Sequence, residues 1–209
     1  MIKTTEGFSE SELLDLVESL KRGGIVCMAT DTVYGLICAA GNEEAVRKLA
    51  GIKGAGRRPF LVLIGELSWL RLLVAEVPAA AERLIARYWP GPLTIVFEAG
   101  KDVGAWLKGS RSTIAVRYPN CLPCRQLLKG LGSPVVSSSA NLQGEDACLT
   151  GREACQAFLE EVDFVVDSGR APTTLPSTII DVTLARPTVL RRGTLNVDDG
   201  QLSEGEANQ

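Results

Sequence analysis

The sequence predicts an α/β protein built on a twisted, open, mixed β-sheet with flanking helices. Helical patterns and short strand-like apolar runs alternate early in the chain, whereas strand-like runs dominate late in it. Strict alternation would favour a wholly parallel sheet, so the late strands favour a mixed one. At 209 residues, with 45% apolar and 22% charged residues, the chain is expected to form one well-buried domain.

Five segments carry helical patterns, and the first is the clearest. Ser9 followed by Glu12 forms a capping-box pattern, apolar residues then recur at helical spacing, and Gly23 and Gly24 end the segment. An asparagine caps the second segment, and prolines begin and break the third. The later four helices are expected at residues 42–51, 78–91, 122–132 and 150–161.

Apolar runs between these helices predict the strands of the sheet. We expect strands at residues 25–29, 60–64, 93–99, 112–119, 134–138, 163–167, 177–183 and 188–193. Residues 1–197 are therefore expected to form the domain. The polar, acidic residues 198–209 are expected to form a disordered tail.

The composition excludes several classes of function. The chain has no histidine, which excludes Ser-His or Cys-His nucleophile systems and histidine-ligated metals. A net charge of −3 argues against a wholesale nucleic-acid binder. No apolar run approaches the roughly 20 residues that span a bilayer, and the acidic start does not resemble a signal peptide. We therefore expect a cytoplasmic protein.

The six cysteines predict thiols rather than a metal centre. Cys121 and Cys124 form a single Cys-x-x-Cys pair, with neither a second pair nor histidines to complete a zinc site. We expect reduced, mostly buried cysteines in a reducing compartment.

Polar residues interrupt the apolar pattern at several strand ends. Thr30, Asp31 and Thr32 follow the first predicted strand, where the alternative is a turn that its own hydroxyls satisfy. Residues 52–60 place three cations on a glycine-rich loop before a strand, which suits phosphate binding but also describes a solvated basic loop. This loop lacks the Gly-Lys-Ser/Thr ending of a P-loop.

The later polar residues follow the same arrangement. Hydroxyls and an amide at residues 137–141 end one strand, and they could bind a ligand or cap a helix. Ser177 opens a strand and Arg191 closes the next. Arg117 ends an apolar strand, so it requires either an anionic ligand or a structural carboxylate. Together these strand ends predict a site for phosphates and a carboxylate.

Seven ordered motifs resemble the YrdC-like (TsaC-type) family of threonylcarbamoyl-AMP synthases. The resemblance covers roughly Gly23 to Gly193 and fits the short, single-domain form. It rests on "TDTVYGL", a basic loop before "PFLVLI", "YWPGPLT", "VRYP", "SSSANLQG", "LPSTIIDV" and "VLRRG". The resemblance implies a concave, basic cavity in the twisted sheet.

The activity implied by the resemblance is that of a nucleotidyltransferase. Such enzymes combine L-threonine, bicarbonate and ATP, with Mg²⁺, into threonylcarbamoyl-adenylate and pyrophosphate. A separate transferase complex then uses the product to make N6-threonylcarbamoyladenosine at position 37 of tRNA. The substrate carbamate is itself the nucleophile, so the chemistry needs no histidine. Asp31 is one candidate for taking the proton of the threonine amine.

The resemblance also implies roles for individual residues. Lys53 and Arg57 are expected to act in catalysis. The threonine-binding residues are expected to be Thr32, Tyr34, Arg117 and Ser177. The ATP-binding residues are expected to be Lys53, Arg57, Arg58, Ser139, Asn141 and Arg191. No protein side chain is expected to bind a metal.

The chain departs from the family pattern in the basic loop. The family element reads Lys-x-Arg, whereas Lys53 is followed here by Gly54 and Ala55. Our hypothesis is that Arg57, or else Arg58, supplies the displaced guanidinium.

Two other functions fit the same residues less well. One is an RNA-binding or ribosome-maturation protein that uses the same basic cavity. Weak binding of tRNA is an expectation under either function. The chain has few aromatic residues for stacking on bases. The other is the carbamoyl-adenylate-forming domain of hydrogenase maturation factors, which lies in much longer chains.

Overall fold

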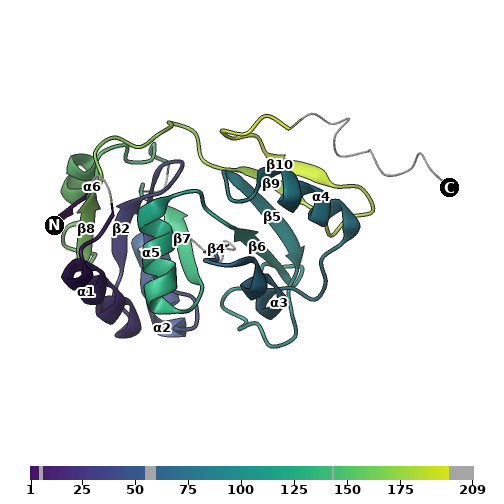
Figure 1. Ribbon diagram of the computed structural model, residues 1–209, viewed down its shortest axis with the longest axis horizontal. Helices are drawn as coiled ribbons and strands as arrows, with labels where there is room; N and C mark the ends of the chain where they lie inside the picture. The colour runs from purple at the N-terminus through teal and green to yellow at the C-terminus, as the bar shows by residue number, and fades with distance from the viewer. Residues whose placement is uncertain (5–6, 55–59, 143, 198–209) are drawn as a thin grey trace.

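The described residues of the chain form a ten-stranded sheet with helices on both of its faces (Figure 1). The computed structural model describes residues 1–4, 7–54, 60–142 and 144–197. Arg57 and Arg58 of the basic loop, and the predicted tail at 198–209, therefore lie outside the described residues.

The predicted helices are confirmed, with boundaries that follow their caps. Ser9 caps the first helix and exchanges both capping-box hydrogen bonds with Glu12, whereas Asn42 caps the second. A second capping box, between Thr150 and Glu153, begins the last helix. The helices are α1 (Glu10–Lys21), α2 (Glu43–Ile52), α3 (Leu70–Leu73), α4 (Ala79–Tyr88), α5 (Leu122–Leu131) and α6 (Gly151–Phe158), with a 3₁₀ turn at Leu67–Trp69. The 3₁₀ turn and α3 were not predicted.

Each predicted strand is present within two residues of its expected ends. The sequence reasoning missed β1, which is very short, and β3, which follows the "TDTV" segment directly. The strands are β1 (Ile2–Lys3), β2 (Val26–Ala29), β3 (Tyr34–Ala39), β4 (Leu61–Leu63), β5 (Leu93–Glu98), β6 (Thr113–Arg117), β7 (Val135–Ser139), β8 (Phe164–Asp167), β9 (Thr178–Asp181) and β10 (Thr188–Arg191).

The sheet is mixed, as predicted. Its order is β1-β8-β2-β3-β7-β4-β6-β5-β9-β10. Strands β4 and β6 run parallel, as do β5 and β9, whereas β7 is antiparallel to both β3 and β4. This order brings the segment after β2, the end of β6, the end of β7 and the start of β9 together. Those are the places where the sequence has polar residues.

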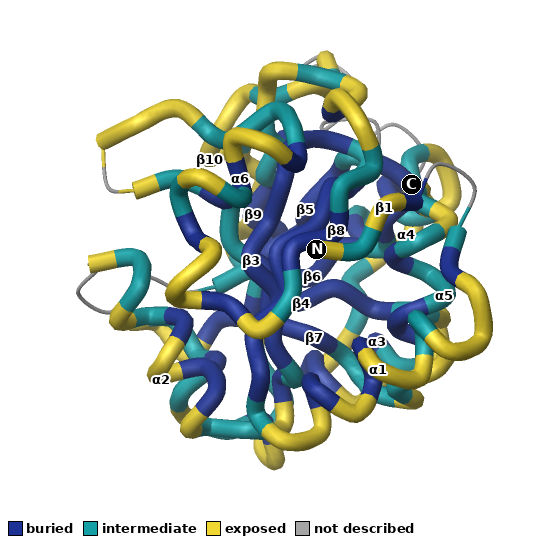
Figure 2. The backbone as a smooth tube through the Cα atoms, turned by 90° about the vertical axis from the view of Figure 1, so that its left-hand side faces the viewer, coloured by how far each residue is buried: buried dark blue, intermediate teal, exposed yellow. Residues whose placement is uncertain are grey.

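Apolar side chains form a core on each face of the sheet, because successive strand residues point to opposite sides. On one face, Val26 and Met28 of β2 pack with buried leucines of α1 and α5. On the other face, Cys27 and Ala29 pack with residues of α2, α4 and α6. Figure 2 shows the buried strands at the centre and the exposed backbone outside them.

Two sequence predictions concern the environment of the chain. Every helix in the described residues is too short or too polar to cross a membrane. All six cysteines are free thiols, as predicted, with Cys27, Cys38 and Cys124 buried and the others half-buried.

Candidate active site

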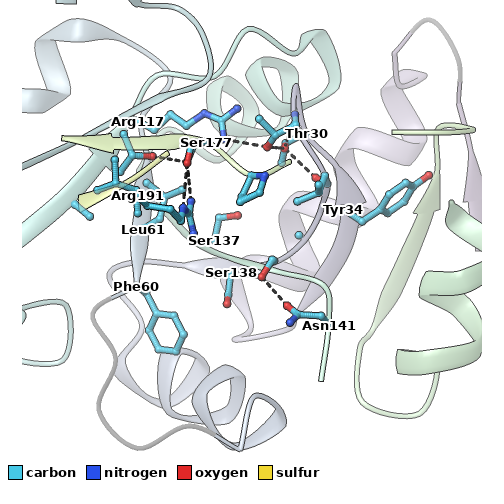
Figure 3. Close-up of a pocket in the computed structure, with 18 of the residues that line it drawn as sticks. Thr30, Tyr34, Phe60, Leu61, Arg117, Ser137, Ser138, Asn141, Ser177 and Arg191 are labelled. Carbon is cyan, nitrogen blue, oxygen red and sulfur yellow. Dashed lines mark hydrogen bonds between the residues drawn. The ribbon is translucent and has the colours of Figure 1, made fainter. Parts of the chain in front are cut away.

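A cavity of about 540 Å³ opens where the turn after β2, the ends of β6 and β7 and the start of β9 meet (Figure 3). Its volume lies in the range of roughly 300–1,000 Å³ that is typical of small-molecule sites. Figure 3 shows Arg117, Ser177 and Arg191 at one side of the cavity and Asn141 at the other. Every predicted site residue that the structure describes lines it: Thr32, Tyr34, Lys53, Arg117, Ser139, Asn141, Ser177 and Arg191.

The segment Thr30–Val33 is the turn that joins β2 to β3. The Thr30 hydroxyl donates to the Val33 carbonyl at 2.9 Å and lies 2.9 Å from the Thr32 hydroxyl. The Thr32 amide donates back to the Thr30 hydroxyl at 3.1 Å. The alternative of a turn satisfied by its own hydroxyls is therefore correct, but the same turn also lines the cavity.

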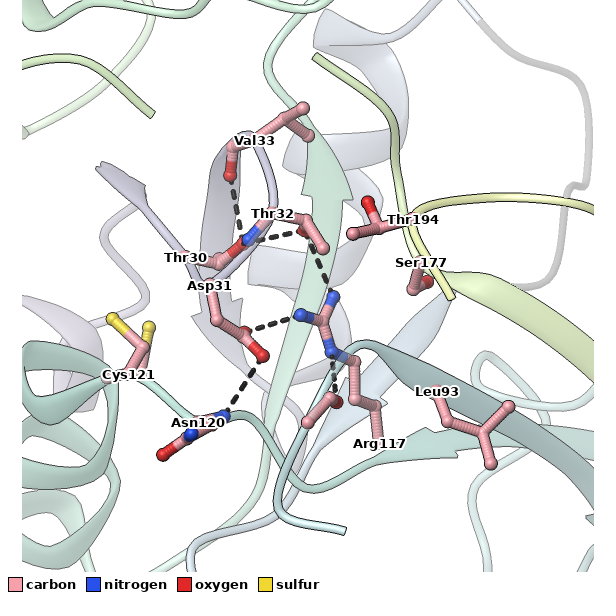
Figure 4. Close-up of polar contacts among 12 residues, drawn as sticks. Thr30, Asp31, Thr32, Val33, Leu93, Arg117, Asn120, Cys121, Ser177 and Thr194 are labelled. Atoms are coloured by element: carbon pink, nitrogen blue, oxygen red, sulfur yellow. Dashed lines mark hydrogen bonds and ion pairs between the residues drawn. The ribbon is translucent and has the colours of Figure 1, made fainter. Parts of the chain in front are cut away.

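Arg117 extends from the end of β6 and is only 2% exposed. Its Nε donates to the Gly91 carbonyl at 3.1 Å, and its Nη1 donates to the Thr32 hydroxyl at 3.1 Å. Its Nη2 forms an ion pair with Asp31 (Figure 4). The structural carboxylate considered for this arginine is therefore Asp31, and the guanidinium is held in a fixed orientation at the cavity wall.

Asp31 is occupied by two hydrogen-bond donors. One carboxylate oxygen accepts from Arg117, and the other accepts from the Asn120 amide at 3.0 Å (Figure 4). Both carboxylate oxygens therefore already have a donor within the fold. Asp31 therefore neutralises Arg117, and this geometry disfavours the role of base considered from the sequence.

Ser177 and Arg191 form a second cluster with a residue that sequence reasoning missed. The Arg191 guanidinium donates to the Ser177 carbonyl at 2.8 and 3.1 Å and to its hydroxyl at 3.2 Å. The buried Thr94 hydroxyl lies 2.8 Å from the Ser177 hydroxyl. As a polar residue in the apolar run 93–99, Thr94 carried a signal that could have identified it.

The charges of this cluster favour an anionic ligand. Burial lowers the pKa of Arg191 from its ordinary value, and the nearby positive charge of Arg117 lowers it further. Both effects disfavour the charged form, although arginine remains protonated at neutral pH. An anion between the two guanidinium groups would relieve their mutual repulsion.

Lys53 lies at the C-cap of α2 and reaches across to the end of β7. Its Nζ donates at 2.7 Å to the Ser139 carbonyl and to the Asn141 side-chain oxygen, and it also contacts the Asn141 carbonyl. The Ser139 hydroxyl donates to the same Asn141 side-chain oxygen at 2.6 Å. This network places an ammonium group on the opposite side of the cavity from Arg191.

Tyr34 lines the cavity, but its hydroxyl lies elsewhere. The hydroxyl donates to the Gly169 carbonyl at 2.7 Å and accepts from the Ser168 amide at 3.1 Å. Burial raises the pKa of Tyr34 to about 12. Figure 3 shows the ring directed away from the other labelled side chains. The hydroxyl thus joins the start of β3 to the segment after β8.

Tyr34→Phe is therefore expected to change stability more than substrate binding. The substitution leaves the Ser168 amide and the Gly169 carbonyl without this partner, which costs about 1–3 kcal/mol. Urea unfolding should show this loss, whereas KM values should stay within about threefold of the wild type. A tenfold rise in the KM of one substrate, without a loss of stability, would instead place the hydroxyl in the binding site.

Glycine and apolar residues complete the wall. Gly35 pairs with Ser139 across β3 and β7, and a Cβ at Gly35 would lie 3.0 Å from the Ser137 hydroxyl oxygen. Phe60 and Leu61 also line the cavity. Nothing in the sequence distinguished these residues from ordinary core residues.

The fold and the site define a class of protein. Hydroxyls and the cations Lys53, Arg117 and Arg191 gather at the ends of strands in a mixed α/β sheet, and the chain has no histidine. Such a site suits the binding and positioning of an anionic small molecule.

Comparison with known proteins identifies the family. The sequence model of Sua5/YciO/YrdC, described as telomere recombination, matches residues 18–193. The chain belongs to this family.

Three relatives illustrate the similarity. A threonylcarbamoyl-AMP synthase of Pseudoalteromonas translucida is 35% identical over 82% of this chain and 94% of its own length. A threonylcarbamoyl-AMP synthase of Pyrococcus abyssi is 30% identical over 99% of this chain but only 61% of its own length. The crystal structure of P. abyssi Sua5 with L-threonine superposes with a TM-score of 0.89 at 31% identity, over 93% of this chain and 57% of that one.

Proposed function

We propose that this protein is an L-threonylcarbamoyladenylate synthase. The observation that carries the proposal is the convergence of Lys53, Arg117 and Arg191 with the strand-end hydroxyls on one cavity. The names of the P. abyssi and P. translucida relatives support the same activity. The presence of L-threonine in the P. abyssi Sua5 structure supports this amino acid as a substrate.

The proposed reaction has two steps. The neutral amine of threonine combines with bicarbonate, losing water, to give a carbamate. A carbamate oxygen then attacks the α-phosphorus of ATP, forming threonylcarbamoyl-adenylate and expelling pyrophosphate. The protein aligns the reactants and stabilises the phosphate charge that develops.

We assign threonine binding and phosphate binding to different sides of the cavity. Arg117, held by Asp31, and the adjacent Thr32 bind the threonine carboxylate and hydroxyl. Ser177 completes that wall. Lys53 and Arg191, together with Ser139 and Asn141, bind the nucleotide phosphates. Arg57, or else Arg58, contributes the remaining cation; both arginines lie outside the described residues.

Mg²⁺ fits this site as a companion of ATP. The described lining contains hydroxyls and amides but no carboxylate, and the described residues include no cluster of His, Cys, Asp or Glu that could hold a metal ion. Mg²⁺ would therefore bind through the phosphates and neutralise part of their charge.

The test is incubation of the protein with ATP, Mg²⁺, bicarbonate and L-threonine, followed by detection of pyrophosphate and threonylcarbamoyl-adenylate. Both products should depend on threonine and on bicarbonate. Pyrophosphate release that is independent of threonine would contradict the proposal. Tight tRNA binding at physiological salt, without threonine or ATP, would instead favour the RNA-binding alternative.

Arg57→Ala is expected to lower kcat/KM for ATP more than tenfold, because a tenfold change corresponds to only about 1.4 kcal/mol. Arg58→Ala is expected to have a smaller effect. Steady-state kinetics of the two single variants and the double variant would decide the assignment. If even the double variant loses less than tenfold, neither arginine replaces the family residue that Ala55 displaces.

The proposed function also implies a cellular role. The product would pass to a tRNA threonylcarbamoyl transferase complex that modifies adenosine 37. Such a role places the protein in the cytoplasm with tRNA. Weak direct binding of tRNA is part of this proposal.

A further inference from the structure

The Cys-x-x-Cys pair, Cys121 and Cys124, lies next to the start of the Thr30–Val33 turn. Cys121 is the N-cap residue of α5 and is half-buried, whereas Cys124, in the first turn of the helix, is 2% exposed. Their sulfur atoms lie 3.8 and 3.6 Å from the same acceptor, the Ala29 carbonyl oxygen. Ala29 ends β2 and immediately precedes the turn.

The fold brings the two thiols together at one carbonyl group. The N-cap residue and the third residue of the helix have neighbouring side chains, and here both sulfur atoms approach the same carbonyl oxygen. Four residues later, the Arg125 amide closes the first helical turn on the Cys121 carbonyl at 3.0 Å, so the helix fixes the backbone of the pair.

The two thiols differ in reactivity. The Cys124 thiol and then the Cys124 amide stabilise a thiolate at Cys121, which lowers the pKa of Cys121 despite its burial. The interaction with Cys121, and then burial, raise the pKa of Cys124 above its ordinary value. A half-buried cysteine of lowered pKa beside a fully buried partner is the arrangement of an attacking and a resolving thiol.

We propose that Cys121 and Cys124 form a thiol–disulfide exchange site for small disulfides such as oxidised glutathione, and that its oxidation loosens the Thr30–Val33 turn. The Cys121 thiolate attacks the small disulfide, forms a mixed disulfide and releases one glutathione thiolate. Cys124 loses its proton and attacks the Cys121 sulfur, expelling the second glutathione. The pair loses two electrons and two protons, and the small disulfide is reduced to two thiols.

Oxidation of the pair alters two contacts next to the cavity. It removes both S–H donors from the Ala29 carbonyl, next to Thr30. It also repositions the backbone beside Asn120, whose amide holds the Asp31 carboxylate that pairs with Arg117 (Figure 4). Lower activity of the oxidised protein rests on the proposed function, whereas disulfide formation and the mobility of the turn do not.

The chemical test uses the full chain in mixtures of reduced and oxidised glutathione, quenched with acid and alkylated in denaturant. Trypsin, cleaving after Arg117 and Arg125, yields a peptide of residues 118–125 with both cysteines of the pair and no other. In oxidising mixtures this peptide should carry no alkyl group and be two hydrogens lighter than the unalkylated reduced form. Dithiothreitol should restore two alkylated cysteines.

Two variants sharpen the result. Cys124→Ser should stop at a Cys121–glutathione adduct, whereas Cys155→Ser, which changes another half-buried cysteine, should leave disulfide formation unchanged. A peptide 118–125 that takes two alkyl groups in every mixture would overturn the proposal. A persistent glutathione adduct on wild-type Cys121 would overturn it as well.

The structural consequence is measured by amide hydrogen exchange and by activity. Exchange of residues 30–34 should become about fivefold faster on oxidation, the change expected from losing one net hydrogen bond of about 1 kcal/mol. Threonine-dependent pyrophosphate release should fall by a similar factor on oxidation and recover on reduction. In Cys124→Ser, which cannot form the disulfide, this fall should not occur. A disulfide that forms with unchanged exchange at residues 30–34 would overturn the link to the turn. Faster exchange in a protein without synthase activity would leave the thiol site standing and refute only the proposed function.

Discussion

Replacing Arg117 with methionine is expected to lower kcat/KM for threonine at least about a hundredfold and to reduce the free energy of unfolding by about 3–5 kcal/mol. Both effects follow from the burial of Arg117, whose guanidinium is paired with Asp31 and bonded to the Thr32 hydroxyl and the Gly91 carbonyl. Arg117 and the Asn120 amide both donate to the Asp31 carboxylate, and the substitution removes the first of these donors. Urea unfolding and steady-state kinetics measure the two effects separately.

A double-mutant cycle separates binding from folding at this pair. Asp31→Asn keeps the size of the side chain but removes its charge, so it should destabilise the protein with Arg117 in place. Combined with Arg117→Met, it should recover at least half of the stability lost by the single arginine variant, because no uncompensated charge remains. Activity should stay low if Arg117 binds the substrate carboxylate. Recovery of activity together with stability would show that the arginine serves only the fold.

The place of the cavity could be predicted because most of the polar residues that interrupt the apolar pattern lie at strand ends. In a buried sheet, hydroxyls and cations at such positions need partners or a ligand, so Arg117, Ser139 and Ser177 were identifiable without coordinates. The mixed sheet followed similarly from the order of helical and strand-like patterns. The position of β3 did not, because its pairing with β7 joins segments about a hundred residues apart.

The features of the site that the sequence did not predict depend on the direction of individual side chains. Tyr34 lies in a segment that lines the cavity, yet its hydroxyl bonds to Gly169. Asp31 was considered as a base, but folding places it against Arg117. Thr94 is a lone polar residue in an apolar run, and only the register of β5 beside β9 places it at Ser177. Tertiary contacts determine the direction of each of these side chains, and local sequence patterns do not encode those contacts.

Lys53→Met is expected to lower kcat/KM for ATP by about a hundredfold, while the KM for threonine changes less than about threefold. The Lys53 ammonium lies across the cavity from the guanidinium of Arg191, on the side of Ser139 and Asn141. Its hydrogen bonds to the Ser139 carbonyl and the Asn141 side chain hold the ammonium at the cavity wall, where its charge can act on a phosphate group. Methionine keeps an apolar stem of similar length and removes only the cation.

Lys48→Met provides the matched control on the same helix. Lys48 is half-exposed and forms a 3.5 Å ion pair with Asp163, outside the cavity lining. Exposed ion pairs contribute about 0–1 kcal/mol, so this variant should keep its kinetics within about twofold of the wild type. Threonine binding without ATP, measured calorimetrically, should survive in Lys53→Met because the Arg117 side of the cavity is unchanged. If Lys53→Met instead weakens threonine binding as much as ATP use, the lysine maintains the shape of the turn after β7, and phosphate binding must rest on Arg191 and the basic loop.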